Sequence, residues 1–235
     1  MKELPKSDIY EQEFKYMPWG VLIDKILAII EKEAAQNGKV LDLMCGPGYL
    51  LGEIEKRRND LVLEGTDISE EFINFAQSKY PKISFQVADA LLWNPTKKYD
   101  VILCTGGIHH LPYDKQAPFL EKIPEALSSN GFVIFADPYI DDYTNESERK
   151  QSVAKLGYEY MVATIKNGAS DDIVKATVDI LYNDVMGFEY KTSIKKLEPI
   201  FKKLFPQLEM KKTWPESNSE YGDYYIIGKG GKGAF

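Results

Sequence analysis

The sequence has few cysteines and no long apolar run. Its 235 residues include two cysteines, Cys45 and Cys104, which are too few for the disulfide framework of a small secreted domain. Both lie at the ends of apolar stretches, so we expect buried, free thiols in a reducing compartment. No stretch reaches the ~20 apolar residues of a membrane-spanning helix, and residues 1–16 lack the apolar centre of a signal peptide. We therefore expect a cytoplasmic protein that does not bind membranes.

Positive charge is also scarce. The chain has 29 Lys and Arg residues against 36 Asp and Glu residues, which gives a net charge of −7. Such a chain repels polyanions at long range, so we do not expect nucleic acid as a partner, although a local basic patch could override the average. With 44% hydrophobic residues and no internal repeat, the length suits one large domain with an insertion, as a monomer or a homodimer.

Apolar strands alternate with amphipathic helices in the first part of the chain. The strands are expected at 39–44, 61–67, 83–89, 99–106 and 131–138, and the helix before the last of them at 113–131. Strands separated by helices indicate βαβ units and a parallel sheet. Two further strands, 208–216 and 222–230, are joined by a polar loop. A hairpin of this kind adds an antiparallel strand to the sheet.

The alternation stops after residue 138. Apolar residues at helical spacing predict helices through most of 139–190, with no strong strand before the end of that segment. The expected organisation has four parts: an N-terminal helical cap (1–38), a ligand-binding core (39–138), a helical lid insertion (139–190), and a C-terminal helix and hairpin that complete the core (191–235).

A glycine-rich turn, Cys45-Gly46-Pro47-Gly48, joins the first strand to the first helix of the core. Glycines there let the backbone approach a ligand, and ligands of such sheets bind at the carboxyl ends of the strands. Tyr49 and Leu50 follow the turn where a P-loop needs Lys and Ser or Thr, which excludes that motif. The dinucleotide pattern fails at Leu51, which takes the place of its third glycine. A tight turn without a ligand is the alternative.

Three acids fall at or near the ends of successive strands beside this turn: Asp42, Asp67 and Asp89. Asp42 lies among apolar residues, where a carboxylate is costly to bury without a partner. A pocket lined by carboxylates, without Lys or Arg, suits a ligand that carries a sulfonium and an ammonium group and no phosphate. Each acid alone could be an ordinary cap or turn residue, but the three together favour S-adenosylmethionine.

Five segments taken in order resemble the motifs of class I S-adenosylmethionine-dependent methyltransferases. They are "VLDLMCGPG", "LEGTDIS", "VADALLW", "YDVILCTGGIHHL" and "LSSNGFVIFADP", and together they span about 39–138. The resemblance implies an α/β, Rossmann-like fold with a seven-stranded sheet of order 3-2-1-4-5-7-6. Strand 7 is antiparallel, and helices cover both faces. It also implies a methyltransferase (transferase) that uses S-adenosyl-L-methionine and releases S-adenosyl-L-homocysteine.

The resemblance also assigns cofactor-binding roles. Gly46 and Gly48 pass close to the methionine part of the cofactor. From its burial alone, Asp42 is expected either to orient their turn or to meet a cationic ligand. Asp67 binds the ribose hydroxyls. The remaining contacts are Ile68 against the adenine, Asp89 and Ala90 at the adenine amine, and Thr105, which begins the segment facing the sulfonium.

The acceptor is expected to be a small molecule of biosynthesis or secondary metabolism, methylated on oxygen or nitrogen. The insertion resembles the lid of small-molecule methyltransferases, and the segment after the fourth strand lacks the Asn/Asp-Pro-Pro signature and the paired glutamates of other subclasses. It keeps only the last residue of a Glu-x-x-Glu-His metal motif, so no metal site is expected, with His109, His110 and Asp137 as the open alternative. A protein or RNA methyltransferase, or a silent cofactor-binding subunit, remains possible.

The candidate catalytic residues are the chain's two histidines, His109 and His110. Either imidazole can accept a proton from a hydroxyl or phenol acceptor, and His110 is preferred because it matches the family pattern. Candidate substrate-binding residues are aromatic side chains of the N-terminal cap and the lid, for which plain packing is the alternative: Tyr10, Tyr16, Trp19, Tyr139 and Tyr143.

Overall fold

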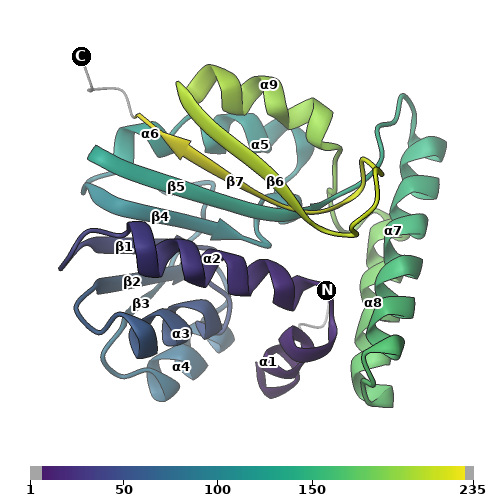
Figure 1. The fold of residues 1–235 in the computed structure, drawn as a ribbon, viewed down its shortest axis with the longest axis horizontal. Coiled ribbons are helices and arrows are strands. Elements are labelled where there is room, and N and C mark those ends of the chain that lie inside the picture. Colours follow the sequence, from purple (N-terminus) through teal and green to yellow (C-terminus); the bar gives the residue numbers. More distant parts are fainter. Residues whose placement is uncertain (1–6, 231–235) are drawn as a thin grey trace.

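A computed structural model describes residues 7–230, which form a seven-stranded sheet flanked by helices (Figure 1). The strand order is β3-β2-β1-β4-β5-β7-β6, as predicted, and β7 is antiparallel to both of its neighbours. The strands are β1 (Lys39–Leu43), β2 (Val62–Asp67), β3 (Ser84–Val87), β4 (Tyr99–Thr105), β5 (Leu127–Tyr139), β6 (Gln207–Trp214) and β7 (Gly222–Lys229).

Helices cover both faces of the sheet because the strands are apolar on both sides. One buried cluster joins the sheet to α2 (Trp19–Glu33), α3 (Tyr49–Arg57) and α4 (Glu70–Lys79). A second cluster joins the other face to α5 (Tyr113–Leu120), α6 (Ile123–Ala126) and α9 (Ile194–Leu204). In α9, the buried residues Ile194, Leu197 and Phe201 recur at helical spacing, as expected for a helix with one buried face.

The helix predicted over 113–131 is wrong in its second half. The structure has the short helices α5 and α6 there, and β5 already begins at Leu127. Leu127 pairs with Tyr99 across the sheet, and a register shift follows before Phe132 pairs with Val101. A Cβ at Gly131 would lie 2.8 Å from the Tyr99 carbonyl oxygen, so this glycine permits close approach of two strands and does not end a helix.

The insertion after β5 is a pair of long helices, α7 (Glu146–Lys166) and α8 (Asp171–Met186), which stand beside the sheet in Figure 1. A buried contact closes the base of this hairpin. The Arg149 side chain is 2% exposed and donates to the Asp184 carbonyl oxygen at 3.2 Å. The Asp184 carboxylate in turn pairs with Lys191 Nζ at 2.7 Å, with both residues buried. The hairpin is therefore anchored at its base, and α1 (Ser7–Tyr16) contacts it from the other end of the chain.

Both cysteines are free and buried, as expected, and burial raises the pKa of each thiol well above its usual value. Within residues 7–230, no helix has the length and apolar character needed to cross a membrane.

Candidate active site

The glycine turn lies at the carboxyl end of β1 and has the backbone that only glycine adopts easily. Gly46 and Gly48 have φ values of 54° and 81°. A Cβ on Gly48 would lie 2.8 Å from the Phe85 ring, so the turn also packs closely on β3. Met44, just before the turn, has φ 60° despite its side chain, a conformation that costs roughly 1–2 kcal/mol in a non-glycine residue. The turn is therefore held in one shape by its surroundings.

Asp67, at the end of β2, joins this turn to the start of α4. Its carboxylate accepts hydrogen bonds from the backbone N–H groups of Gly46 at 2.8 Å and Ser69 at 2.9 Å. Burial raises the pKa of Asp67, while these two N–H donors act in the opposite direction. Ser69 Oγ then caps α4 by accepting from Phe72 N–H, as its sequence position predicts. Asp67 is thus placed where a ligand lying on the turn would meet a carboxylate.

Asp42 is a buried carboxyl inside β1, 1% exposed. Its Oδ1 atom has no hydrogen-bond partner among the described residues. Burial, and the nearby charge of Asp67, raise the pKa of Asp42 to about 8. An acid that is buried without a partner beside a glycine turn fits a cationic ligand, which is the property that S-adenosylmethionine would supply with its ammonium and sulfonium groups.

The expected adenine side of this pocket is apolar and open. Ile68 is 67% exposed although it directly follows Asp67, and Leu92 is 80% exposed nearby in sequence to Asp89. The Asp89 carboxylate accepts from Leu91 N–H at 2.8 Å and forms the turn after β3. Ala90 is buried, and Thr105 is half-buried at the end of β4. The predicted cofactor residues therefore surround the carboxyl ends of β1 to β4, and their individual roles remain predictions.

Asp42 gives an expected pH dependence of stability. Its pKa is about 8 in the folded chain, against 3.8 for an unperturbed aspartate, so above pH 4 the unfolded chain releases a proton that the folded chain keeps. The stability linked to this group is complete below about pH 4 and is lost as the pH rises toward 8. We expect Asp42→Asn to gain stability relative to the parent between pH 6 and 8, by at most about 1.4 kcal/mol per pH unit. Urea unfolding of both proteins at pH 6, 7 and 8 measures this difference, and parallel pH profiles would contradict it.

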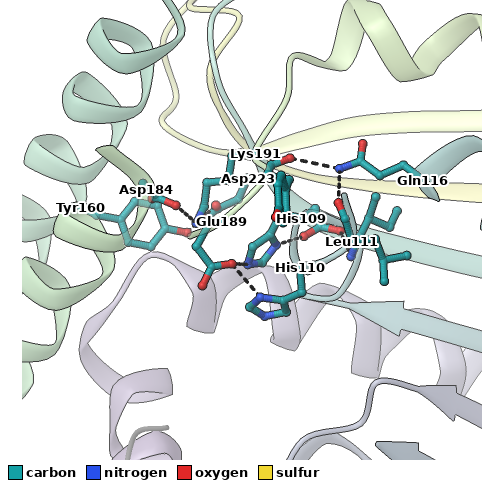
Figure 2. Close-up of polar contacts among 12 residues, drawn as sticks. His109, His110, Leu111, Gln116, Tyr160, Asp184, Glu189, Lys191 and Asp223 are labelled. Atoms are coloured by element: carbon teal, nitrogen blue, oxygen red, sulfur yellow. Dashed lines mark hydrogen bonds and ion pairs between the residues drawn. The ribbon is translucent and has the colours of Figure 1, made fainter. Parts of the chain in front are cut away.

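The segment after β4 carries the histidines on a single 3₁₀ turn, η1 (Ile108–His110). Gly106, with φ 63°, lets the chain turn out of the sheet. His109 Nδ1 lies 2.5 Å from Asp137 Oδ1 on β5, and the other oxygen of Asp137 accepts from Ile108 N–H at 3.1 Å. Burial raises the pKa of Asp137 to about 8. Asp137 therefore orients the His109 ring, whose Nε2 atom faces Glu189 (Figure 2).

Glu189, from the segment between α8 and α9, reaches both histidines (Figure 2). Its Oε2 atom lies 2.6 Å from His110 Nδ1 and 3.7 Å from His109 Nε2. Glu189 is 3% exposed, while the His110 side chain is 49% exposed. The backbone supports this arrangement, because Tyr190 N–H donates to the His109 carbonyl oxygen at 2.7 Å. The two predicted catalytic residues thus belong to a carboxylate-rich cluster that opens on one side.

The predicted substrate-binding aromatics lie in different surroundings. Trp19 lies beside Gly106, because a Cβ on that glycine would lie 3.3 Å from the Trp19 ring. Tyr143 packs near the base of the α7–α8 hairpin, and Tyr139 is a core residue at 1% exposure whose hydroxyl has no partner among the described residues. Tyr16 is half-buried, and the side chain of Tyr10 lies outside the described part of the chain. An open cavity of about 520 Å³ lies beside Trp19, lined by α1, the start of α2, α7 and Trp214.

Sequence reasoning missed Glu189, Lys191 and Asp223. Asp223 is fully buried on β7, its Oδ1 accepts from the Tyr160 hydroxyl of α7, and burial raises its pKa to about 7. Lys191 and Glu189 lie about 80 residues from the histidines in sequence, in a segment without a recognisable motif. Only the pairing of strands and the return of the chain from α8 to α9 bring these side chains together.

Comparison with known proteins agrees with the observed fold. Residues 40–131 match the family model of a methyltransferase domain. A carboxy-S-adenosyl-L-methionine synthase from Campylobacter fetus is 30% identical over 49% of this chain and 50% of its own length. A trans-aconitate 2-methyltransferase from Methylobacterium radiotolerans is 32% identical over 48% of this chain and 42% of its own. The chain thus spans about half the length of these two relatives.

Solved structures show the same fold over almost the whole chain. The plantazolicin methyltransferase BpumL in complex with SAH superposes with a TM-score of 0.63 at 15% identity, covering 95% of this chain and 89% of that one. The DhpI–SAH complex superposes with a TM-score of 0.57 at 16% identity, covering 91% and 84%. The sheet order agrees with the match of residues 40–131 to a methyltransferase domain. The predicted fold is confirmed, and the domain match supports the predicted methyltransferase class.

Proposed function

We propose that the whole chain transfers a methyl group from S-adenosylmethionine to a small-molecule acceptor that enters between the histidine turn and the α7–α8 hairpin. The observation that carries this proposal is the juxtaposition of Asp42, Asp67 and the glycine turn at the carboxyl ends of β1 and β2. The buried Asp42 Oδ1 has no partner among the described residues, and Asp67 accepts a hydrogen bond from Gly46 N–H. The helical hairpin that stands beside the carboxyl end of β5 supports a small acceptor, because a lid in this place would exclude water from the reaction (Figure 1).

In this proposal the chain's residues mainly bind and align. When bound, S-adenosylmethionine supplies a methyl group carried on a positively charged sulfur. The leaving group is neutral S-adenosylhomocysteine. The lone pair of the acceptor forms the new bond to the methyl carbon as the carbon–sulfur bond breaks, and the bond's electrons remain on sulfur. Gly106 and Gly107 bring the backbone near this centre, and the histidine turn holds the acceptor in line. Removal of a proton by His110 or His109 stays a prediction.

Asp67→Ala is the first test of this function. The variant removes the carboxylate that accepts from Gly46 N–H and Ser69 N–H, so both the turn and the ribose partner are lost. We expect S-adenosylmethionine binding to weaken by roughly 1–3 kcal/mol, the cost of leaving polar groups unpaired. Isothermal titration calorimetry measures this change. Asp67→Asn keeps one acceptor oxygen, so its affinity for S-adenosylmethionine should lie between those of the parent and Asp67→Ala. Asp114→Ala, at an exposed position of α5, should bind like the parent.

The acceptor class needs a direct measurement. The assay compares incorporation of the labelled methyl group of S-adenosylmethionine into small-molecule extract, total protein and total RNA. We expect incorporation into the small-molecule fraction. A relative named carboxy-S-adenosyl-L-methionine synthase, from Campylobacter curvus, is 26% identical over 78% of this chain and 79% of its own length. Mass spectrometry of the cofactor product therefore accompanies the assay. Transfer into RNA or protein alone, a carboxylated cofactor, or an inert protein with tight cofactor binding would each overturn the proposal.

A further inference from the structure

His109, His110 and Glu189 place three metal-ligating atoms close together at the reaction end of the sheet (Figure 2). The ring nitrogens and the carboxylate oxygen all lie within 4.8 Å of one another. Two imidazoles and one carboxylate form a donor set that divalent transition metals prefer. The three residues come from two segments far apart in sequence, so neighbouring positions in the chain do not explain why Glu189 joins the histidines.

The distances distinguish shared ligation from simple hydrogen bonding. Two ligands of one tetrahedral ion at about 2.1 Å lie about 3.4 Å apart. His109 Nε2 and Glu189 Oε2 are 3.7 Å apart, which is long for a hydrogen bond but close to that separation. His110 Nδ1 and Glu189 Oε2 are 2.6 Å apart and would have to separate by less than 1 Å. The two ring nitrogens lie within 4.8 Å of each other, so they would have to approach by at most about 1.4 Å (4.8 minus 3.4). Side-chain movements of this size would convert the cluster into a three-ligand site.

Asp137 gives His109 the support that metal-binding histidines usually have. A ligating imidazole commonly donates its second N–H to a carboxylate, which fixes the ring and the tautomer. His109 Nδ1 makes this contact with Asp137 at 2.5 Å, and Asp137 itself is held by Ile108 N–H. Nε2 is then the atom that faces Glu189.

The charge around the cluster also favours a bound cation. Four buried carboxylates gather here, and the cation that reaches into them, Lys191, is already paired with Asp184. The carboxylates are those of Asp137, Asp184, Glu189 and Asp223. Burying an ionised carboxylate without a cation is costly, and a divalent cation would offset the charge of Glu189 itself. Arg149, which is buried at the hairpin base, pairs with Glu146 instead.

We propose that His109 Nε2, His110 Nδ1 and Glu189 Oε2 bind one divalent transition-metal ion, with Zn²⁺ as the best match to the donor set. This replaces the expectation of no metal site drawn from the sequence. Three protein ligands leave at least one coordination position open, and the half-exposed His110 marks the open side. The role of the open position rests on the proposed function: it binds an oxygen atom of the acceptor, from a hydroxyl or phenol group. A metal there would lower the pKa of that oxygen, whose proton would pass to solvent water at the open side, so no histidine base is required.

Metal binding is measured on the full-length chain without cofactor or acceptor, so its outcome is independent of methyl transfer. The protein is stripped with a chelator and titrated with Zn²⁺ by calorimetry, and with Co²⁺ by visible absorption. We expect one ion per chain and a tetrahedral or five-coordinate Co²⁺ spectrum. His110→Ala and Glu189→Gln should each weaken binding at least about 100-fold, and Asp137→Asn about 10–100-fold with unchanged stoichiometry. Asp114→Asn, an exposed carboxylate on α5, is the matched control and should bind like the parent.

The proposal is overturned if the parent binds neither ion at concentrations up to about 1 mM. It is also overturned if both His110→Ala and Glu189→Gln bind as the parent does. Since His110 is half exposed, its alanine variant is expected to fold even if Glu189→Gln does not, and it then decides the question alone. Full methyl transfer by the stripped enzyme in the presence of chelator would show that the histidines act without a metal. Metal binding without any methyl transfer would leave the site intact and refute only the proposed function.

Discussion

Replacing residues 150–183 with a short flexible linker is expected to abolish methyl transfer while S-adenosylmethionine still binds. The cut preserves Arg149 and Asp184, whose contact at 3.2 Å shows that a short linker spans the gap. The predicted cofactor residues lie on the sheet, so we expect cofactor affinity to change by less than about threefold. The acceptor would lose the helices that hold it and exclude water, and transfer should fall at least about 10³-fold. Calorimetry and single-turnover kinetics measure the two effects separately.

The control for this deletion is Tyr160→Phe in the full-length chain. The deletion also removes the Tyr160 hydroxyl, which donates to the buried Asp223 carboxylate on β7, so the effect of that loss has to be measured separately. If Tyr160→Phe turns over normally, the deletion reports on the hairpin itself. Simultaneous loss of cofactor binding and turnover in the deletion variant would mean that the helices are part of the folded core. Full activity would mean that they do not cover the acceptor.

Lys191→Met is expected to lower the free energy of unfolding by about 3–5 kcal/mol. The variant leaves the Asp184 carboxylate buried without its cation, and breaking one side of a buried ion pair has this cost. Urea denaturation at pH 7 measures the change. Lys195→Met is the matched control. Lys195 makes an exposed ion pair with Glu220, so its loss should hardly change the free energy of unfolding.

A second variant separates the pair from the packing of the lysine chain. Lys191→Met combined with Asp184→Leu replaces both buried charges by apolar groups, and this exchange is often neutral or stabilising. We therefore expect the double variant to recover most of the lost stability. If Lys191→Met is as stable as Lys195→Met, the buried pair contributes little to the fold. If the double variant is no more stable than Lys191→Met, the stability lost in Lys191→Met comes from altered packing of the segment before α9.

The buried charges also bear on the acceptor. The histidine cluster is surrounded by buried carboxyl groups. A carboxylate acceptor would be repelled at that place unless a metal or a protonated histidine lay between. An uncharged hydroxyl or phenol bound to the open metal position avoids this repulsion. The metal titration and the acceptor screen therefore constrain each other.

The sequence by itself determined the sheet and the cofactor end of the site. Alternating apolar strands and helices specify parallel βαβ units, and Gly46, Gly48 and Asp67 follow strands whose ends meet at one edge. Local spacing was sufficient there because each of these residues lies within a few positions of a strand end. The length of the last helix before β5 was the exception, because strand pairing at Leu127 overrode the helical pattern.

Only the tertiary structure decided the surroundings of the histidines. Asp137 meets His109 because β4 and β5 are adjacent, and Asp223 joins them because β7 inserts beside β5. Glu189 arrives from the far side of a helical hairpin, held by the Tyr190 backbone contact and by the Lys191–Asp184 pair. No periodicity or motif in the chain encodes contacts between segments about 80 residues apart. They follow from the packing of complete elements, and so the cluster became visible only in the folded molecule.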